Sequence, residues 1–329
     1  MSIKVLLLTP YSFLKYGGVQ NQVNLIEDYL LSHEEFEVKV FAHGKTESLD
    51  SNKVFNIPFN SSISSVLLFP NRKLLRDYID WADVVHVHEP FVPIFFWKIP
   101  KNKKYIFTHH ASLGVIITNI LSIAYKFFRY RSISTYVSKS AESNALSLNS
   151  EAVLIPNMIK INQNISFNKS QGYLFIGRQE TRKNYSYFVK LSNHSQFKNK
   201  LFYAVTNKDK SDKNITIFKD PTDKFKIEIF GKTNIYLALN TKSESFGITL
   251  LEAVNNGNLV ISSDLSAFIN VLPNSYIVYK NNNFESLSKI LTKLDTKDLT
   301  FLWNKQYKDI RKYDLEENMK KIILLYSKL

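Results

Sequence analysis

Short apolar runs alternate with longer amphipathic stretches along the first half of the chain. Six of these runs have the length of a strand and lie at 3–9, 36–43, 83–89, 104–110, 132–138 and 152–157. Between the first two, residues 19–32 carry apolar side chains at helical spacing. Because strands that alternate with helices pair in parallel through helical crossovers, the pattern predicts an α/β domain with a doubly wound parallel sheet.

The same rhythm restarts after a polar segment at 160–171. Strand-length runs follow at 173–178, 201–207, 234–240, 259–264 and 275–280, with amphipathic stretches at 184–195 and 246–257. From Phe301 onward, apolar residues recur near helical spacing. The pattern predicts an N-terminal Rossmann-like domain over 1–160, a C-terminal Rossmann-like domain over 171–310, and a final helix over 311–329 that packs back on the N-terminal lobe.

The composition agrees with two folded domains and limits the cellular compartments in which the protein is expected. The chain has 329 residues, 44% of them hydrophobic, with only 9 Gly and 9 Pro. Domains of about 150 residues each suit this length. Cysteine is absent, which excludes disulfides, thiolate metal sites and a cysteine nucleophile. The first apolar run is too short for a signal peptide, and the longest stretch without charge, 105–125, contains His and Asn and does not suit a transmembrane helix. The expected location is the cytoplasm.

The charge balance indicates an anionic partner. The formal net charge is +14, and the isoelectric point is near 9.5. From 98 to 139 every charged residue is basic: Lys98, Lys101, Lys103, Lys104, Lys126, Arg129, Arg131 and Lys139. Aromatic residues such as Phe95, Trp97 and Tyr130 accompany them, a mixture that suits contact with an anionic membrane surface. The alternative is a Lys-rich composition with the aromatic side chains in the core. Nucleic acid is disfavoured as a partner because no recognition module is present.

The segment 244–252, ESFGITLLE, places two glutamates on either side of a helix start. Gly247 and the amides after it would open the helix, and unpaired N–H groups at the positive end of a helix dipole suit a phosphate. Glu252 lies about five residues into the helix and can accept hydrogen bonds from a sugar diol, because helical side chains lean toward the N-terminus. Glu244 can meet a second hydroxyl-bearing group. The alternative is two solvated acids.

Two further loops supply candidates for phosphate binding. In GRQETRKN (177–184), between a strand and a helix, Arg178 and Lys183 can neutralise a pyrophosphate, the leaving group of a nucleotide sugar. Arg182 is expected to be solvated. In the first half, Gly17 and Gly18 open a helix after the first strand and allow a phosphate or sugar to approach, although glycine pairs are also common in turns.

A histidine cluster allows a metal interpretation. His86 and His88 share one face of a strand, and Glu89, His109 and His110 lie close in the sequence. However, there is no Asp-x-Asp pair to hold a divalent ion on a pyrophosphate. Because cationic side chains and helix amides can neutralise that group, no divalent metal and no other cofactor is expected.

Eight stretches, in their order and spacing, resemble the retaining glycosyltransferases of family four, which have the GT-B fold. They are PYSF with GGVQ (10–20), DVVHVHEP (83–90), THH (108–110), YVSKSA (136–141), LIPN (154–157), GRQETRK (177–183), ESFGITLLEA (244–253) and SSDLSAF (262–268). The motifs look most similar to those of bacterial phosphatidyl-myo-inositol mannosyltransferases. The resemblance implies two Rossmann-like domains that face each other across the cleft that holds the active site. Two departures are Met158, which replaces a usual glycine, and 204–214, which replaces a glycine-rich turn.

The resemblance also implies roles for individual residues. On the donor side, Arg178 and Lys183 would bind the pyrophosphate and Glu252 the ribose. The transferred sugar would be held by Glu244, Phe246, Gly247, Ile248 and Thr249. From the other lobe, Gly18 would approach the donor phosphate, His110 would contact the sugar near the reacting carbon, and Tyr11 and Gln20 would face the acceptor. The implied catalytic set is His110, Arg178, Lys183 and Glu244.

The resulting hypothesis is a retaining hexosyltransferase that moves a hexose from GDP-mannose or a UDP-hexose to a hydroxyl of a lipid-linked or cell-envelope glycan. A catalytically inactive GT-B subunit of a glycosylation complex is the alternative, and the intact acidic and basic residues argue against it. In the related mannosyltransferases a basic helix docks on the membrane. Here Arg72, Lys73 and Arg76 occupy that helix, with Asp77 and Asp80 among them. Docking would place the protein on the inner face of the cell membrane.

Overall fold

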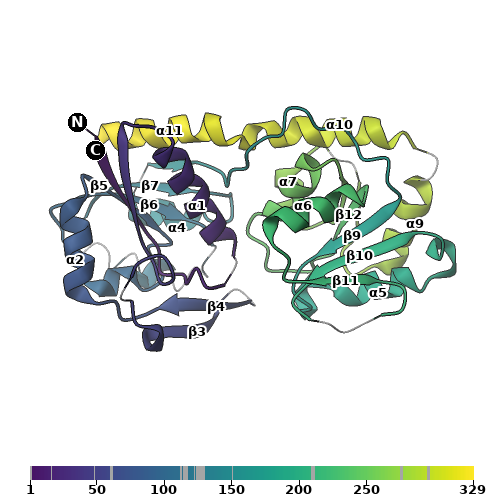
Figure 1. Ribbon diagram of the computed structural model, residues 1–329, viewed down its shortest axis with the longest axis horizontal. Helices are drawn as coiled ribbons and strands as arrows, with labels where there is room; N and C mark the ends of the chain where they lie inside the picture. The colour runs from purple at the N-terminus through teal and green to yellow at the C-terminus, as the bar shows by residue number, and fades with distance from the viewer. Residues whose placement is uncertain are drawn as a thin grey trace. The chain divides into compact units, whose positions relative to one another are not determined.

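The computed structural model describes residues 1–329 except 1, 16, 48, 60–61, 112, 114–117, 122, 124–129, 150, 209–211, 275–276 and 295–296. The chain divides into two compact units. Unit 1 contains Met1–Met158 and Leu315–Leu329, and unit 2 contains Ile159–Asp314 (Figure 1).

Unit 1 is built on a parallel sheet in the order β2-β1-β5-β6-β7-β8. Its strands are β1 (Ile3–Leu8), β2 (Phe36–Phe41), β5 (Val84–His88), β6 (Lys104–His109), β7 (Arg131–Tyr136) and β8 (Ala152–Leu154). Leu6, Leu7 and Leu8 are fully buried. A strand covered on both faces reads as a continuous apolar run, which is the pattern of β1. A separate antiparallel hairpin joins β3 (Val54–Phe59) to β4 (Ser62–Leu67).

Helices cover both faces of the unit 1 sheet. Among the described residues they are α1 (Gly18–Leu31), α2 (Arg72–Trp81), α4 (Glu142–Leu148) and α11 (Leu315–Lys328). On one face α1 and α11 share a core that contains Val23, Ile26 and Met319, and Figure 1 shows the two helices along the same side of the sheet. On the other face α2 packs through Leu75 and Ile79. The predicted return of the final helix to the N-terminal lobe is therefore confirmed.

Unit 2 repeats this architecture. Its parallel sheet has the order β11-β10-β9-β12-β13-β14. The strands are β9 (Gly172–Ile176), β10 (Leu201–Thr206), β11 (Thr216–Lys219), β12 (Ile235–Ala238), β13 (Leu259–Ser263) and β14 (Val278–Tyr279). The helices are α5 (Tyr185–Ser192), α6 (Asp223–Gly231), α7 (Ile248–Asn255), α8 (Ser266–Val271), α9 (Phe284–Leu294) and α10 (Leu299–Ile310). Leu174, Leu237 and Leu251 lie in one core. The predicted pair of doubly wound sheets is confirmed.

The polar segment between the two predicted domains belongs to unit 2. Ile161 lies in the unit 2 core, and Asn168 Nδ2 lies 3.0 Å from the carbonyl oxygens of Phe230 and Thr233. The first division therefore falls after residue 158, where the sequence pattern predicted 160. A segment rich in polar residues can still be part of a domain when its amides complete the hydrogen bonds of buried carbonyls.

The final helical stretch is broken, and its two parts join different units. A 3-10 turn at Arg311–Tyr313 separates α10 from α11. In unit 2, Trp303 Nε1 donates to the carbonyl oxygen of Val254 at 3.0 Å, and the Gln306 amide makes two hydrogen bonds to the Val260 backbone. Tyr313 also packs on unit 2, with its ring 5.3 Å from that of Phe246. The second division consequently falls after residue 314, where the pattern predicted 310.

The strand order reverses at one point in each sheet. β1 lies between β2 and β5, and β9 lies between β10 and β12. Ligands of open α/β sheets bind outside the carboxyl ends of the strands at such a reversal. The loops after β1, β9 and β12 carry predicted site residues, and the loop after β5 begins with Glu89. Topology thus brings motifs that are distant in sequence to one edge of each sheet.

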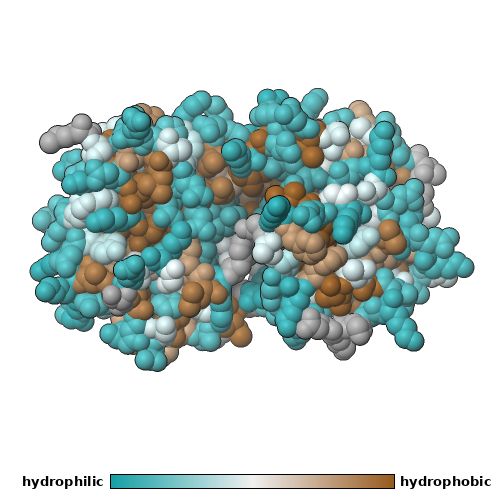
Figure 2. Space-filling model, viewed as in Figure 1, coloured by the Kyte–Doolittle hydropathy of each residue, from teal (hydrophilic) through white to brown (hydrophobic). Residues whose placement is uncertain are grey.

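Polar side chains form most of the surface. Figure 2 shows hydrophilic residues over most of the visible face of both units, with small apolar patches among them. In the part of the chain that the structure describes, no helix is long and apolar enough to cross a membrane.

Candidate active site

The loop that leads into α7 carries the first part of the unit 2 site. Gly247 stands immediately before α7 with φ at +98°, in the left-handed region that favours glycine. A Cβ at this position would lie 3.0 Å from ring atoms of Phe268. Among the described residues, no side chain caps the start of α7. Its first N–H groups therefore remain available to a ligand at the positive end of the helix dipole.

Two predicted residues meet in this loop region. Lys183, from the 3-10 turn Thr181–Lys183 after β9, donates from Nζ to Oε2 of Glu244 at 3.0 Å. Asn240 Nδ2 donates to the same oxygen at 2.6 Å. The Lys183 and Glu244 side chains are 17% and 19% exposed, so the pair is partly desolvated but reachable. The sequence patterns did not predict Asn240, which follows β12 without a motif of its own.

Arg178 and Arg182 flank Glu180 in the loop after β9. Arg178 Nε lies 3.1 Å from Oε1 of Glu180, and Arg182 Nε lies 3.0 Å from Oε2. Arg178 is the more exposed, at 42% of its side chain. The expectation that Arg182 is solvated was wrong, because its residue is buried and its carbonyl oxygen accepts from the amide of Thr241 at 2.8 Å. Arg182 thus ties the β9 loop to the β12 loop.

Glu252 has a cationic partner that the sequence patterns missed. Lys226 on α6 donates from Nζ to Oε2 of Glu252 at 2.6 Å, and the two side chains are 12% and 18% exposed. Elsewhere on α7, Thr249 accepts at Oγ1 from the hydroxyl of Tyr236 at 3.1 Å. No spacing rule links Lys226 to Glu252, since the two helices are brought together only by their packing.

Other predicted residues of this edge have structural side chains. Phe246 is 6% exposed and packs against Tyr313, so only its backbone can face a ligand. Ile248 is the first residue of α7 and offers a backbone amide at the helix start.

At the unit 1 edge, three predicted residues surround the loop after β1. Gly18 is the first residue of α1, and Gln20 Nε2 donates to the carbonyl oxygens of Ser12 at 3.0 Å and Lys15 at 3.3 Å. Tyr11 is 6% exposed and pairs with Val66 of β4. Burial, together with the nearby Glu89, raises the pKa of Tyr11. Gln20 and Tyr11 therefore shape the loop at 12–15.

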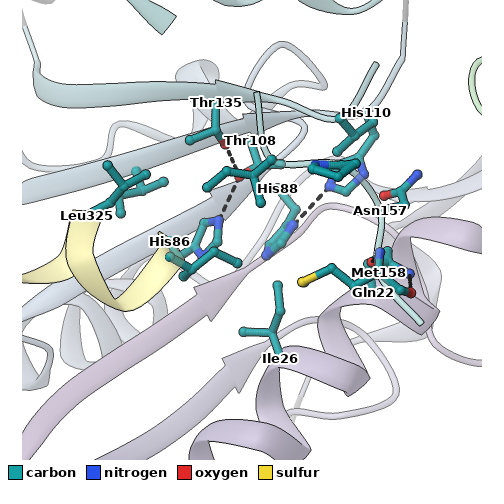
Figure 3. Close-up of a pocket in the computed structure, with 15 residues that line it drawn as sticks. Gln22, Ile26, His86, His88, Thr108, His110, Thr135, Asn157, Met158 and Leu325 are labelled. Carbon is teal, nitrogen blue, oxygen red and sulfur yellow. Dashed lines mark hydrogen bonds between the residues drawn. The ribbon is translucent and has the colours of Figure 1, made fainter. Parts of the chain in front are cut away.

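His110 belongs to a buried cluster of imidazole and hydroxyl groups (Figure 3). Its Nε2 lies 3.0 Å from Nδ1 of His88. His86 lies 2.7 Å from Thr108 Oγ1 through Nε2 and 2.9 Å from the Tyr326 hydroxyl through Nδ1. These groups border a cavity of about 20 Å³ whose lining also includes Gln22, Ile26, Asn157, Met158 and Leu325.

The cluster is electrically neutral near pH 7. Burial lowers the pKa of His110 to about 4 and the pKa of His86 and His109 to about 3. It also lowers the pKa of His88 well below its usual value. Burial raises the pKa of Glu89 to about 8, although the amides of His110 and Ala111 oppose this shift. Within the described residues, no group of three or more His, Asp or Glu is arranged to hold a metal ion.

The basic residues considered for membrane contact separate into two groups. Arg72, Lys73 and Arg76 of α2 line a groove of about 380 Å³ together with Lys98. Lys101, Lys103, Lys104 and Arg131 instead lie just before or at the amino ends of β6 and β7. Lys126 and Arg129 lie outside the described residues.

The aromatic part of the membrane interpretation was wrong for three side chains. Phe95, Trp97 and Tyr130 are 4%, 3% and 7% exposed and pack in the unit 1 core. Large aromatic rings stabilise most when they are removed from water, and these rings are removed from water by the protein itself.

Comparisons with known proteins agree with this geometry. The family model described as "Glycosyl transferases group 1" matches residues 158–314, which includes the whole of unit 2. The phosphatidyl-myo-inositol mannosyltransferase of Mycobacterium leprae is 26% identical over 305 residues, 82% of this chain and 81% of that protein. An uncharacterized 41.2 kDa protein in the cps region of Klebsiella pneumoniae is 24% identical over 337 residues, 90% of this chain and 91% of that protein.

Solved structures show the fold. A glycosyltransferase from Rickettsia africae superposes with a TM-score of 0.70 at 16% identity and covers 99% of this chain and 98% of its own. Anabaena Alr3699/HepE in complex with UDP-glucose gives a TM-score of 0.72 at 14% identity, with 99% and 100% covered. Together with the curated relatives, these structures show that the chain has the GT-B fold, and the family match shows that unit 2 is a group 1 glycosyl transferase domain.

Proposed function

We propose that this glycosyltransferase moves a hexose from a nucleoside diphosphate sugar, GDP-mannose or a UDP-hexose, to a hydroxyl group with retention of the anomeric configuration. The grouping of Lys183, Glu244 and Asn240 in the loops at the strand reversal of unit 2 carries the proposal. Two relatives support a sugar nucleotide as donor: one is named a mannosyltransferase, and HepE was solved with UDP-glucose.

The donor diphosphate would bind by exchange of partners at this edge. Lys183 pairs with Glu244 in the structure. A diphosphate is a stronger competitor for a lysine than a single carboxylate, so Lys183 Nζ turns to the phosphate when the donor binds. Arg178 serves as a second cation, and the first amides of α7 add the positive end of the helix dipole. Glu244, which Asn240 still holds, then accepts hydrogen bonds from hydroxyl groups of the sugar.

The nucleoside would bind along α7. Lys226 engages Oε2 of Glu252, and we assign Oε1 of Glu252 to the ribose diol. The contact with Lys226 fixes the direction of the Glu252 carboxylate, which can then accept hydrogen bonds from the two hydroxyl groups. Phe246, Gly247, Ile248 and Thr249 would hold the sugar and phosphate mainly through their backbone, because the Phe246 and Thr249 side chains already have partners in unit 2.

Catalysis in this proposal rests on charge stabilisation and positioning. The bond between the anomeric carbon and the phosphate oxygen breaks, and the electron pair leaves with the diphosphate. The acceptor oxygen bonds to the same face of the anomeric carbon, and its proton passes to the departing phosphate oxygen. Arg178, Lys183 and the α7 amides stabilise the charge that develops on the diphosphate, and the proposal therefore requires no metal ion or other cofactor.

Unit 1 would supply the remaining groups. Gly18 allows the start of α1 to approach the donor phosphate, and His110 contacts the sugar near the reacting carbon. Tyr11 and Gln20 hold the loop at 12–15 for the acceptor, which we propose is a lipid-linked or cell-envelope glycan. The basic groove of Arg72, Lys73, Arg76 and Lys98 would attract an anionic membrane surface, and sedimentation with vesicles that contain or lack anionic lipid tests this contact.

The test of the function is a thermal-shift series with UDP, GDP and their sugars, followed by mass spectrometry of donor hydrolysis. A ligand that binds only the folded chain raises the melting temperature. At a ligand concentration of one hundred times the Kd, it adds about 2.7 kcal/mol to the free energy of unfolding. We expect either UDP or GDP to stabilise the protein, and we expect a hexose conjugate of that nucleotide to be hydrolysed slowly in the absence of an acceptor. If no nucleotide stabilises the protein and no donor is consumed, the proposed function is wrong.

A further inference from the structure

The ends of β5 and β6 place two histidines side by side in unit 1. The strands run parallel with His88 opposite Thr108, and His110 follows the end of β6. His88 is 1% exposed and His110 is 7% exposed. Their ring centroids are 5.3 Å apart with 30° between the planes, and Nδ1 of His88 lies 3.0 Å from Nε2 of His110 (Figure 3). The two rings therefore share one hydrogen bond.

We propose that His88 is a positioning residue for His110: its Nδ1–H donates to Nε2 of His110, which fixes the His110 proton on Nδ1 and holds the ring in one orientation. The role of His110 at the transferred sugar comes from the proposed function, and the value of the positioning rests on it. The hydrogen bond and the tautomer do not depend on any ligand.

The direction of the hydrogen bond follows from the partners of the other two nitrogens. A neutral imidazole has one donor and one acceptor nitrogen. Asn157 lies beside the His110 ring in Figure 3, and its Oδ1 is buried without a hydrogen bond of ordinary geometry among the described residues. A proton on His110 Nδ1 points a donor at this acceptor. The Asn157 side chain also raises the pKa of His110, against the larger lowering by burial.

The opposite assignment leaves more groups unsatisfied. If His110 donated from Nε2, the His88 proton would lie on Nε2, which is buried and has no hydrogen-bond partner among the described residues. The bare Nδ1 of His110 would then face the bare oxygen of Asn157. A buried N–H without an acceptor is rarer than an acceptor without a donor, so the first assignment is favoured.

His88 is itself held in place by His86. Their rings stack at 4.3 Å with 25° between the planes. Both nitrogens of His86 are engaged, one by Thr108 on β6 and the other by Tyr326 on α11. The hydroxyl of Tyr326 on the C-terminal helix therefore holds the His86 ring in place, and the His86 ring stacks on His88. The hydrogen bond from His88 then orients His110. The cavity of about 20 Å³ beside them has room for about one water molecule, which is too little for an imidazole to change its orientation.

The chemical consequence is that His110 meets a ligand as a neutral ring with Nε2 occupied. Such a ring can position a sugar through the C–H edge of the imidazole and through the His110 backbone. It does not exchange a proton through Nε2. His110 would then be a group that orients the substrate, in agreement with a reaction in which the leaving phosphate takes the acceptor proton.

The test compares His88→Leu with His88→Asn in the full chain. Leu and Asn have the same branching, but only Asn can place an N–H near the position of Nδ1. Two-bond 15N–1H correlation spectra at neutral pH report the tautomer of each histidine, and His110→Gln identifies the His110 signals. We expect the Nδ1–H tautomer of His110 in the wild type and in His88→Asn, and a mixture with Nε2–H in His88→Leu.

Turnover gives a second readout. With saturating donor, kcat should fall on the order of ten- to a hundredfold in His88→Leu through misplacement of His110, with KM for the donor little changed, and His88→Asn should recover most of it. A wild-type His110 protonated on Nε2, or a tautomer unchanged in His88→Leu, would overturn the proposal. If His88→Leu does not fold, the wild-type and His88→Asn spectra still decide whether His110 carries its proton on Nδ1. A wild type that consumes no donor contradicts the proposed function and leaves the tautomer result standing.

Discussion

The carboxyl edges of the two sheets have the same topology but differ in charge, because the unit 2 edge carries ionised side chains and the unit 1 edge carries neutral ones. In unit 2 the edge carries ion pairs that are partly exposed, Lys183 with Glu244 and Arg178 with Glu180. In unit 1 the edge carries buried imidazoles and hydroxyls, with His110 bound to His88. Burial holds these histidines neutral and raises the pKa of Glu89 to about 8.

The difference separates two tasks that a transferase must perform. An ion pair that water can reach loses little when one partner moves to a ligand, because the dielectric is high on both sides of the exchange. A buried hydrogen-bond network is costly to disturb, because each freed polar group stays without water. The unit 2 edge is therefore suited to bind and release an anion, and the unit 1 edge is suited to hold groups in fixed positions.

The largest predicted effect is acid unfolding of unit 1. The pKa of His86, His109 and His110 is about 3 to 4 in the folded chain and 6.5 in the unfolded chain. Below pH 6.5 the unfolded chain binds protons that the folded chain excludes. The free energy of unfolding therefore falls as pH falls, by about 1.4 kcal/mol per pH unit for each histidine until its folded pKa is reached.

Tryptophan fluorescence can separate the two units in this titration. Trp97 is buried in unit 1 and Trp303 in unit 2. A Trp303→Phe variant keeps only the tryptophans of unit 1, and a Trp81→Phe/Trp97→Phe variant keeps only that of unit 2. As pH falls, the unit 1 reporter should lose its native fluorescence between pH 6 and 4, and the unit 2 reporter should lose it at a lower pH. Loss of the unit 2 signal at the higher pH would contradict the comparison.

The second effect concerns Glu89. Burial raises the pKa of Glu89 to about 8 in the folded chain, above the 4.5 of a carboxyl group in water. Its contribution to the free energy of unfolding is therefore fully present below pH 4.5 and is lost as pH rises to 8. Glu89→Gln keeps the shape of the side chain and does not titrate. In urea denaturation the variant should gain stability over the wild type from pH 5 to 8, on the order of a few kcal/mol in total, and no further above pH 8. A constant difference across this range would show that Glu89 ionises normally.

The third effect is on turnover through unit 2. Lys183→Ala removes a cation from the diphosphate and should lower kcat by roughly a hundredfold or more, as for loss of one preorganised donor. Lys289→Ala is the matched control, because Lys289 lies in an exposed pair with Glu285 on α9 and should leave turnover unchanged. Full turnover in Lys183→Ala, measured by release of the nucleotide, would remove the central residue of the proposed function.

The smallest effect is expected from Lys226. Lys226→Met keeps the length of the side chain and removes the charge beside Glu252. We expect the affinity for the nucleoside diphosphate to fall about tenfold, with the charge-assisted hydrogen bond lost, and kcat to change little. Calorimetric titration measures the affinity, and the double variant with Glu252→Gln should show less than the sum of the two losses. Additive losses would place Lys226 and Glu252 in separate roles.

Local patterns were sufficient for several features of the candidate site. Gly247 was predicted to open a helix whose first amides face a phosphate, and the structure places it directly before α7, with φ at +98° in the left-handed region that favours glycine. Lys183 and Glu244 were predicted to share a ligand, and the structure brings them to 3.0 Å. Both predictions used loops at the carboxyl ends of strands, whose place is already determined by the strand order.

Other features depended on packing that no local pattern contains. Arg182 looked solvated, yet it is buried between the β9 and β12 loops. Lys226 carried no signal at all, and the aromatic residues Phe95 and Trp97 entered the core and not a membrane face. In each case the partner comes from an element far along the chain, so the residue's own neighbours hold no information about it.

The sequence by itself determined the two sheets, the motif-bearing loops and the basic charge, because strand and helix periods and glycine positions are properties of adjacent residues. Only the tertiary structure decided which cation faces which acid, which histidines lose their charge, and that Tyr326 of the last helix braces the strand that carries His86. The physical reason is that ionisation and hydrogen bonding depend on distance and on exclusion of water, and both arise when distant segments pack together.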